Sequence, residues 1–194
     1  GIGALAWGVG TTELVHAMAT QTVMHRKPQR MRISFNGELP AWLSAKDMIL
    51  HVIGAQGAGA GNGYALEYAG SAVRAMSVEG RMTICNLSIE MAAKVGMVGP
   101  DDQVFEYLNG REYAPKDEAW DLALAHWRTM PTDDEAEFDK DIDIDVSDLK
   151  PQITWGTSPE HVVAVDGLIP DPDKEADPDR RQALRAAQEY IGLN

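Results

Sequence analysis

Cysteine and positive charge are scarce in this sequence, and it contains no long hydrophobic run. Its one cysteine, Cys85, has no second thiol with which to form an internal disulfide. No apolar stretch approaches the ~20 residues of a membrane-spanning helix, and no basic segment precedes an apolar one as in a secretory signal. We therefore expect a soluble cytoplasmic protein without membrane contacts.

Basic residues are outnumbered by acidic ones, 17 against 30, which gives a net charge of −13. Such a surface repels polyanions, so neither nucleic acid nor an anionic membrane is expected as a partner. The acidic residues concentrate in DDEAEFDKDIDIDVSD (133–148), a run typical of a solvated face or an interaction edge. Apolar residues make up 44% of the chain, which is enough to bury a core at this length.

Hydrophobic periodicity predicts strands and helices in alternation. The expected strands are 31–35, 64–70, 81–85, 141–146 and 152–155. The expected helices are 3–24, 44–54, 86–96 closed by Gly96, 103–110 capped by Asp101 or Asp102, 116–130 and 177–190. Ser44 with Asp47, and Asp177 with Pro178, are the clearest helix-start signals. This alternation predicts an α/β layered fold with a largely parallel or mixed sheet.

Two composition changes suggest boundaries, the basic linker HRKPQR (25–30) and the acidic stretch after residue 131. We expect residues 1–29 to end a preceding α/β domain, 30–130 to form a central α/β domain, and 131–194 to start a following one. The chain opens inside an apolar helical pattern without Met and stops just past another helix. It therefore has the pattern of a fragment of a longer polypeptide.

Several local motifs are weak signals. GIGALA (1–6) fits a dinucleotide-binding glycine pattern, but no strand precedes it and position 21 is Gln where an acidic residue is needed. The five histidines include no pair at a zinc spacing. Glu13 and His16 share one face of an expected helix, either as part of a site or as an ordinary surface pair.

Asn86 and Glu90 form the most informative pair, because residues at i and i+4 project from the same helix face. At the start of the expected 86–96 helix, free N–H groups and the helix dipole would favour an anionic ligand. An amide and a carboxylate there could bind a substrate carboxylate or hydroxyl. The ordinary alternative is a capping Asn and a solvated Glu.

Three blocks of sequence resemble one family. They are EGRMTICNLSIEMAAKVGMVGPD (79–101), ITWGTSP (153–159) and GALAWGVGTTELVHAMATQT (3–22). Together they are similar to the isopropylmalate dehydratase branch of the aconitase superfamily, and the similarity extends over essentially the whole chain. The resemblance implies an aconitase-like α/β/α fold of which this chain is one part.

The same resemblance implies roles for two residues. The family carries a substrate-binding Asn and Glu at the positions of Asn86 and Glu90, and its Glu contacts the water or hydroxyl on the open iron of an iron–sulfur cluster. Glu90 is thus the expected catalytic residue, and both residues are expected to bind substrate. Leu87 departs from the family, which more often has Met there.

The implied cofactor is a [4Fe-4S] cluster, which acts as a Lewis acid on the substrate hydroxyl. In the family three cysteines bind it, one in S-C-T-N and two in C-x-x-C, and neither segment is present here. Cys85 does not occupy a ligand position of that pattern. We therefore expect this chain to bind no metal or cluster and to be inactive alone, with a small subunit supplying the catalytic Ser and the substrate-binding Arg.

The resemblance implies a hydro-lyase that interconverts 2- and 3-isopropylmalate by dehydration and rehydration in leucine biosynthesis. One alternative is a hydratase of another hydroxy-diacid, such as homoaconitate, citraconate or dimethylmalate. Another is a non-catalytic domain that only docks a small subunit. An RNA-binding role, known within the superfamily, is disfavoured by the acidic balance.

Overall fold

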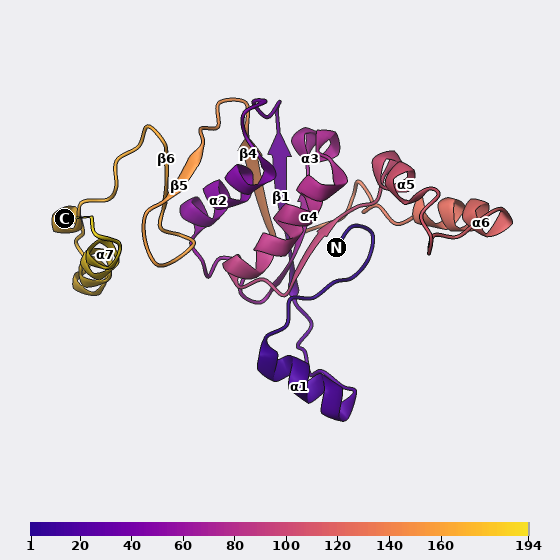
Figure 1. Cartoon of the computed structure of the whole chain (residues 1–194), viewed down its shortest axis with the longest axis horizontal. Coiled ribbons are helices and arrows are strands. Elements are labelled where there is room, and N and C mark those ends of the chain that lie inside the picture. Colours follow the sequence, from indigo (N-terminus) through magenta and orange to yellow (C-terminus); the bar gives the residue numbers. More distant parts are fainter. Residues whose placement is uncertain (194) are drawn as a thin grey trace.

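A four-stranded parallel sheet organises the computed structural model, which describes residues 1–193 (Figure 1). Its strands lie in the order β3-β2-β1-β4. They are β1 (Gln29–Asn36), β2 (Tyr64–Ala69), β3 (Val95–Val98) and β4 (Lys140–Asp145). The class predicted from the sequence, α/β with a mainly parallel sheet, is confirmed.

Helix α2 (Ala45–Gln56) joins β1 to β2 and packs on one face of the sheet (Figure 1). It begins at Ser44, whose N–H and hydroxyl both donate to the Asp47 carboxylate, at 2.9 and 2.8 Å. This is the reciprocal start predicted from the sequence. Its inward side chains meet the apolar face of β1 to form the core, which includes Met31, Ile33, Phe35, Met48, Ile49, Val52 and Ile53, all 0% exposed.

The connection from β2 to β3 differs from the prediction. Residues 81–85 belong to helix α4 (Val78–Asn86), which follows the short α3 (Ser71–Ala75). A single 3-10 turn, η1 (Leu87–Met91), comes next, and β3 begins four residues after it. The predicted strand at 81–85 and the predicted helix at 86–96 are therefore both wrong.

Local signals explain this exchange of helix and strand. The Ser77 hydroxyl accepts the N–H of Gly80 at 3.2 Å and starts α4 upstream of the apolar run. Ala92 takes a left-handed conformation with φ of 61° and ends η1. Gly96 lies within β3, where a side chain would come within 2.0 Å of Ser88 Oγ, so it does not close a helix.

The N-terminal segment is also less helical than predicted. Only α1 (Thr11–Thr20) is helical within the range 3–24, and it buries none of its residues. Residues 1–8 instead run beside the free edge of β3, where Gly3 N donates to Val98 O at 3.0 Å. The glycines in this segment are poor helix formers, and the unpaired edge of β3 offers them hydrogen-bond partners.

Helices α5 (Asp102–Leu108) and α6 (Glu118–Trp127) extend away from the sheet between β3 and β4 (Figure 1). The ring of Phe105 on α5 stacks on Trp127 of α6, with centroids 6.0 Å apart. Asp101 caps α5 by accepting the N–H of Val104 at 3.3 Å. Both helices and this cap agree with the sequence prediction.

The second face of the sheet is polar. Arg32 of β1 makes a forked ion pair with Asp141 of β4, and Asn36 donates to Asp143 at 2.9 Å. The predicted strand in the acidic run is confirmed, with the aspartates of β4 exposed and its isoleucines half-buried. In the described part of the chain, the helices packed on the sheet all lie on its other face, so a second helical layer stays a prediction.

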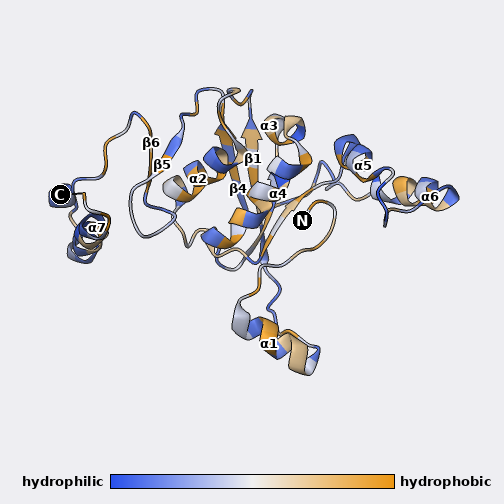
Figure 2. Cartoon of the chain, viewed as in Figure 1, coloured by the Kyte–Doolittle hydropathy of each residue, from blue (hydrophilic) through white to orange (hydrophobic). Residues whose placement is uncertain are grey.

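The C-terminal part contains a two-stranded antiparallel hairpin, β5 (Gln152–Thr154) with β6 (Val162–Ala164). It packs on α2, where Gln152 N donates to the Asp47 carboxylate at 3.0 Å. The short η2 (Pro172–Lys174) and the largely hydrophilic α7 (Pro178–Ile191) follow (Figure 2). Strand β5 and helix α7 match the prediction, whereas β6 has no counterpart in it.

Because β4 pairs with β1, the segment after residue 131 contributes a strand to the sheet of residues 30–130. The division into three domains, 1–29, 30–130 and 131–194, stays a prediction for the longer polypeptide. Among residues 1–193, no helix combines the length and apolarity that crossing a membrane requires.

Candidate functional site

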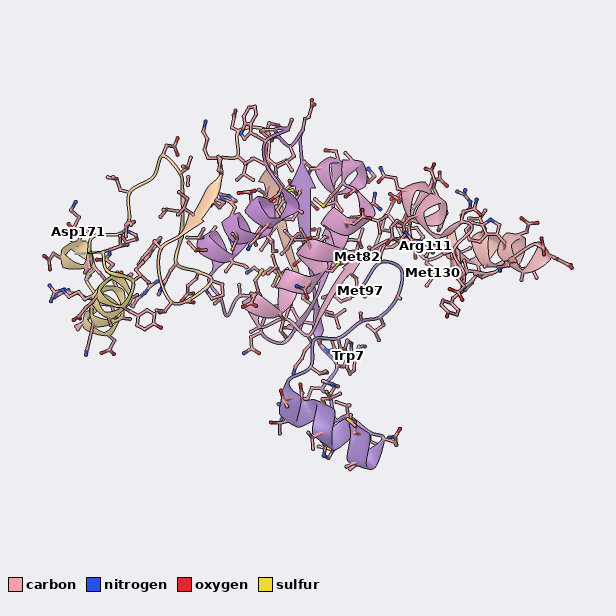
Figure 3. The ribbon with its side chains drawn as sticks, in the orientation of Figure 1. Trp7, Met82, Met97, Arg111, Met130 and Asp171 are labelled. Carbon is pink, nitrogen blue, oxygen red and sulfur yellow. The ribbon has the colours of Figure 1, made fainter. Side chains whose placement is uncertain are left out.

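A pocket of about 410 Å³ lies between the N-terminal segment and the α4–η1 connection. Its walls are mainly apolar and come from Ile2, Ala6, Trp7, Met82 and Ile89. Its polar groups are contributed by Cys85, Asn86, Ser88 and Lys94. Figure 3 shows Met82 on the central ribbon and Trp7 where the N-terminal segment leads to α1.

Close backbone packing shapes this pocket. Ser88 is 2% exposed, and its hydroxyl bonds to Tyr68 OH at 2.8 Å and donates to Ile84 O at 3.1 Å. That hydroxyl lies against Gly96 of β3, where no side chain would fit. On the opposite wall, a side chain at Gly8 would meet Ile89 at 3.0 Å. Two glycines thus allow β3 and the N-terminal segment to approach η1 closely.

Asn86 lies on the pocket at the junction of α4 and the 3-10 turn η1, and no α-helix begins there. It is the last residue of α4 and is exposed, and its side chain makes no capping hydrogen bond. The expectation that free N–H groups of an 86–96 helix would bind an anion is therefore wrong, because that helix does not form. The amide of Asn86 remains available to a ligand in the pocket.

Glu90 lies one turn further along, in η1, and is also exposed. It is not among the residues that line the pocket around Asn86. The structure therefore brings only one member of the predicted pair to this cavity. The other faces open surface beside it, and the roles expected for the two residues stay predictions.

Lys94 is a pocket residue that the sequence analysis missed. Its ammonium lies 3.7 Å from Glu13 Oε1, and both side chains are nearly half exposed. Of the two residues that were expected to share a helix face, Glu13 thus lies near the rim of the pocket, because it contacts Lys94. The other, His16, is exposed on α1. A single Lys just before a short strand carries no local signal of such a position.

Cys85 lines the pocket as a half-buried thiol, and burial raises its pKa. Among residues 1–193, no three His, Cys, Asp or Glu side chains gather into a metal-binding group. The described residues therefore do not fit an iron–sulfur cluster as its ligands.

An ion pair between a buried guanidinium and a partly exposed carboxylate holds α4 in place. Arg81 is 0% exposed, and its guanidinium donates to both oxygens of Asp101, at 2.7 and 2.8 Å. It also donates to the carbonyls of Arg74 and Met76. Partial burial acts to raise the pKa of Asp101, but the hydrogen bonds and charge of Arg81 and the bonds from backbone N–H groups together lower it. The start of α4 is thereby tied to the loop after β3.

The ITWGTSP segment has a structural role in this part of the chain. Trp155 is 5% exposed and stacks on His161, with ring centroids 4.7 Å apart. The Nδ1 atom of His161 accepts the N–H groups of Thr157 and Ser158, at 3.1 and 3.3 Å. These contacts fix the turn between β5 and β6, away from the pocket around Asn86.

Comparison with known proteins extends this picture. The 3-isopropylmalate dehydratase large subunit 1 of Bradyrhizobium diazoefficiens is 54% identical over 193 residues, which cover 100% of this chain and 40% of that protein. The chain thus spans less than half the length of this relative. The model of the aconitase family (aconitate hydratase) matches residues 1–194. Because the match extends over the whole sequence, the chain belongs to the aconitase family.

Proposed function

We propose that the chain is part of the large subunit of a hydro-lyase that isomerises 2-isopropylmalate to 3-isopropylmalate in leucine biosynthesis. The observation that carries this proposal is the 54% identity, over the whole chain, to a 3-isopropylmalate dehydratase large subunit. The aconitase-family match agrees with dehydration and rehydration as the chemistry. In this proposal the protein is cytoplasmic and acts together with a small subunit.

The apolar wall of the pocket around Asn86 suits the isopropyl group of such a substrate. Trp7, Met82 and Ile89 are each nearly half exposed and present apolar surface to the pocket. An isopropyl group gains by covering such surface, whereas the additional carboxylate of homoaconitate would lose hydration there. This wall therefore favours isopropylmalate over the tricarboxylate alternative.

The polar groups beside this wall would orient the rest of the substrate. The Asn86 amide can donate to a carboxylate, and the Lys94 ammonium adds a positive charge at the rim. In this proposal the site extends from the pocket over the exposed surface of η1. Glu90 lies on that surface and would accept a hydrogen bond from the substrate hydroxyl. The [4Fe-4S] cluster would be held by cysteines elsewhere in the longer polypeptide.

The test is an assay of the complete large subunit with its small subunit on isopropylmalate and on the alternative di- and tricarboxylate substrates. We expect isopropylmalate to be turned over with a higher kcat/KM than homoaconitate, citraconate or dimethylmalate. Preference for one of those three would replace the substrate assignment. No turnover of any of these substrates by a folded, cluster-loaded complex would favour the non-catalytic docking domain.

A further inference from the structure

A small cleft of about 170 Å³ opens on the other side of Trp7 and Lys94 from the pocket of Asn86. Four of its other lining residues belong to the linker before β1, namely His25, Arg26, Lys27 and Pro28, and Val95 of β3 completes the lining. Figure 3 shows Trp7 near the junction where α1 leaves the body of the protein. The cleft thus adjoins the candidate site but is a separate cavity.

The cleft gathers positive charge in a chain whose net charge is −13. Arg26, Lys27 and Lys94 line it, and no acidic side chain does. Within residues 1–193, the side chains of Arg26 and Lys27 take part in no ion pair or hydrogen bond, while Lys94 has only its 3.7 Å contact with Glu13. Like charges brought together repel one another, so a bound anion would stabilise this arrangement.

The local backbone holds these groups in a defined geometry. Pro28 fixes its own φ and restricts Lys27 to extended conformations, so the linker has few alternatives. His25 packs edge-on against Trp7, with ring centroids 3.9 Å apart. The Nε2 atom of His25 is buried without a hydrogen-bond partner. Such an atom is uncommon in folded proteins and is often satisfied by a bound ligand or water.

We propose that this cleft is a binding site for a small, doubly charged oxyanion. A guanidinium can bind two oxygens of one anion, and ammonium groups add charge without demanding fixed geometry. The cavity volume suits a group of the size of phosphate, or the two carboxylates of a short dicarboxylate. The cleft shares Trp7 and Lys94 with the pocket of Asn86, but Arg26 and Lys27 line the cleft alone, so substitutions there test the anion site separately.

The experiment uses the complete large subunit with its small subunit, titrated calorimetrically with inorganic phosphate, with malonate, and with chloride at equal ionic strength. The double variant R26Q/K27Q removes two charges from the cleft. The matched control K46Q/K150Q removes two exposed charges elsewhere, at Lys46 and Lys150. We expect the cleft variant to weaken binding at least about tenfold and the control to leave it within about twofold.

The titrations with different anions identify the class of ligand. Binding of phosphate that R26Q/K27Q removes assigns the cleft to phosphate groups, and binding of malonate alone that it removes assigns it to dicarboxylates. Equal weakening in the two double variants would overturn the proposal, because net charge and not the cleft would then govern affinity. Heats no larger than those of chloride would also overturn it. Loss of isomerase activity in either variant would concern the proposed function only.

Discussion

Helix α4 presents two faces that differ in chemistry. Arg81 and Ile84 point inward and are 0% exposed, whereas Met82 and Asn86 border an open pocket. The inward face is held by four hydrogen bonds of one guanidinium. The pocket face makes few contacts of its own. Stability and the proposed activity therefore depend on different residues of the same helix. Substitutions on one face should change stability, and substitutions on the other face should change activity.

The largest expected effect is the loss of the inward ion pair. Asp101→Ala leaves the Arg81 guanidinium buried without its carboxylate, which typically costs about 3–5 kcal/mol. Urea unfolding of the complete large subunit measures this loss. The control is Asp102→Ala, which breaks the exposed pair with Arg128 and should cost no more than about 1 kcal/mol. Equal losses for the two variants would show that burial of Arg81 does not determine the stability of this region.

On the pocket side, Glu90→Gln should lower kcat by about 10²–10⁴-fold while stability stays unchanged. The proposed reason is loss of the charged carboxylate, because the neutral amide of Gln is a weaker acceptor for the substrate hydroxyl and cannot take up its proton. Glu90 is exposed, so its replacement removes no buried contact. The measurement is kcat of the two-subunit enzyme, together with its melting temperature and cluster occupancy.

Glu79→Gln is the matched control for Glu90, since it removes an exposed carboxylate from the first turn of α4, away from the pocket. It should leave kcat within about twofold, as expected for surface substitutions. Normal turnover by Glu90→Gln with a full cluster would make Glu90 an ordinary surface residue.

A smaller effect is expected for Asn86→Ala, which removes one proposed hydrogen bond to a substrate carboxylate. Such a bond to a charged group contributes about 1.5–3 kcal/mol, so kcat/KM should fall by roughly 10–100-fold. Steady-state kinetics of the complete enzyme measure this change, and Asn62→Ala in the loop before β2 is the control. If both variants retain the original kcat/KM, the pocket around Asn86 is not the substrate site.

Much of the sheet was predictable because its signals are local. Strands β1 and β4 alternate apolar and polar residues, and the Ser44–Asp47 start of α2 depends on residues three apart. The α4–β3 region was not predictable in this way, because a short apolar run such as RMTIC fits a helix or a strand equally well. There the Ser77 cap and the close packing of Ser88 on Gly96 decided the outcome.

The candidate site was predictable only in part. Asn86 and Glu90 were found through a family resemblance, not through periodicity, and the structure places only Asn86 on the pocket. Arg81 and Lys94 carried no signal, because their roles depend on Asp101 and Glu13, which lie 20 and 81 positions away in sequence. Contacts of this kind come from tertiary packing.

The smallest expected effect is a pH dependence of the inward ion pair. The folded-state pKa of Asp101 is lowered, because the bonds from Arg81 and from backbone N–H groups outweigh the opposing effect of burial. The unfolded chain then binds a proton more readily than the folded one. The pair therefore contributes its full stability above the unfolded pKa, near 3.9, and loses it as pH falls through the lower folded value.

The difference in unfolding free energy between the wild type and Asp101→Asn should thus shrink between about pH 5 and pH 2. Urea unfolding of both proteins at several pH values measures this difference. A constant difference would show that Arg81 does not lower the pKa of Asp101.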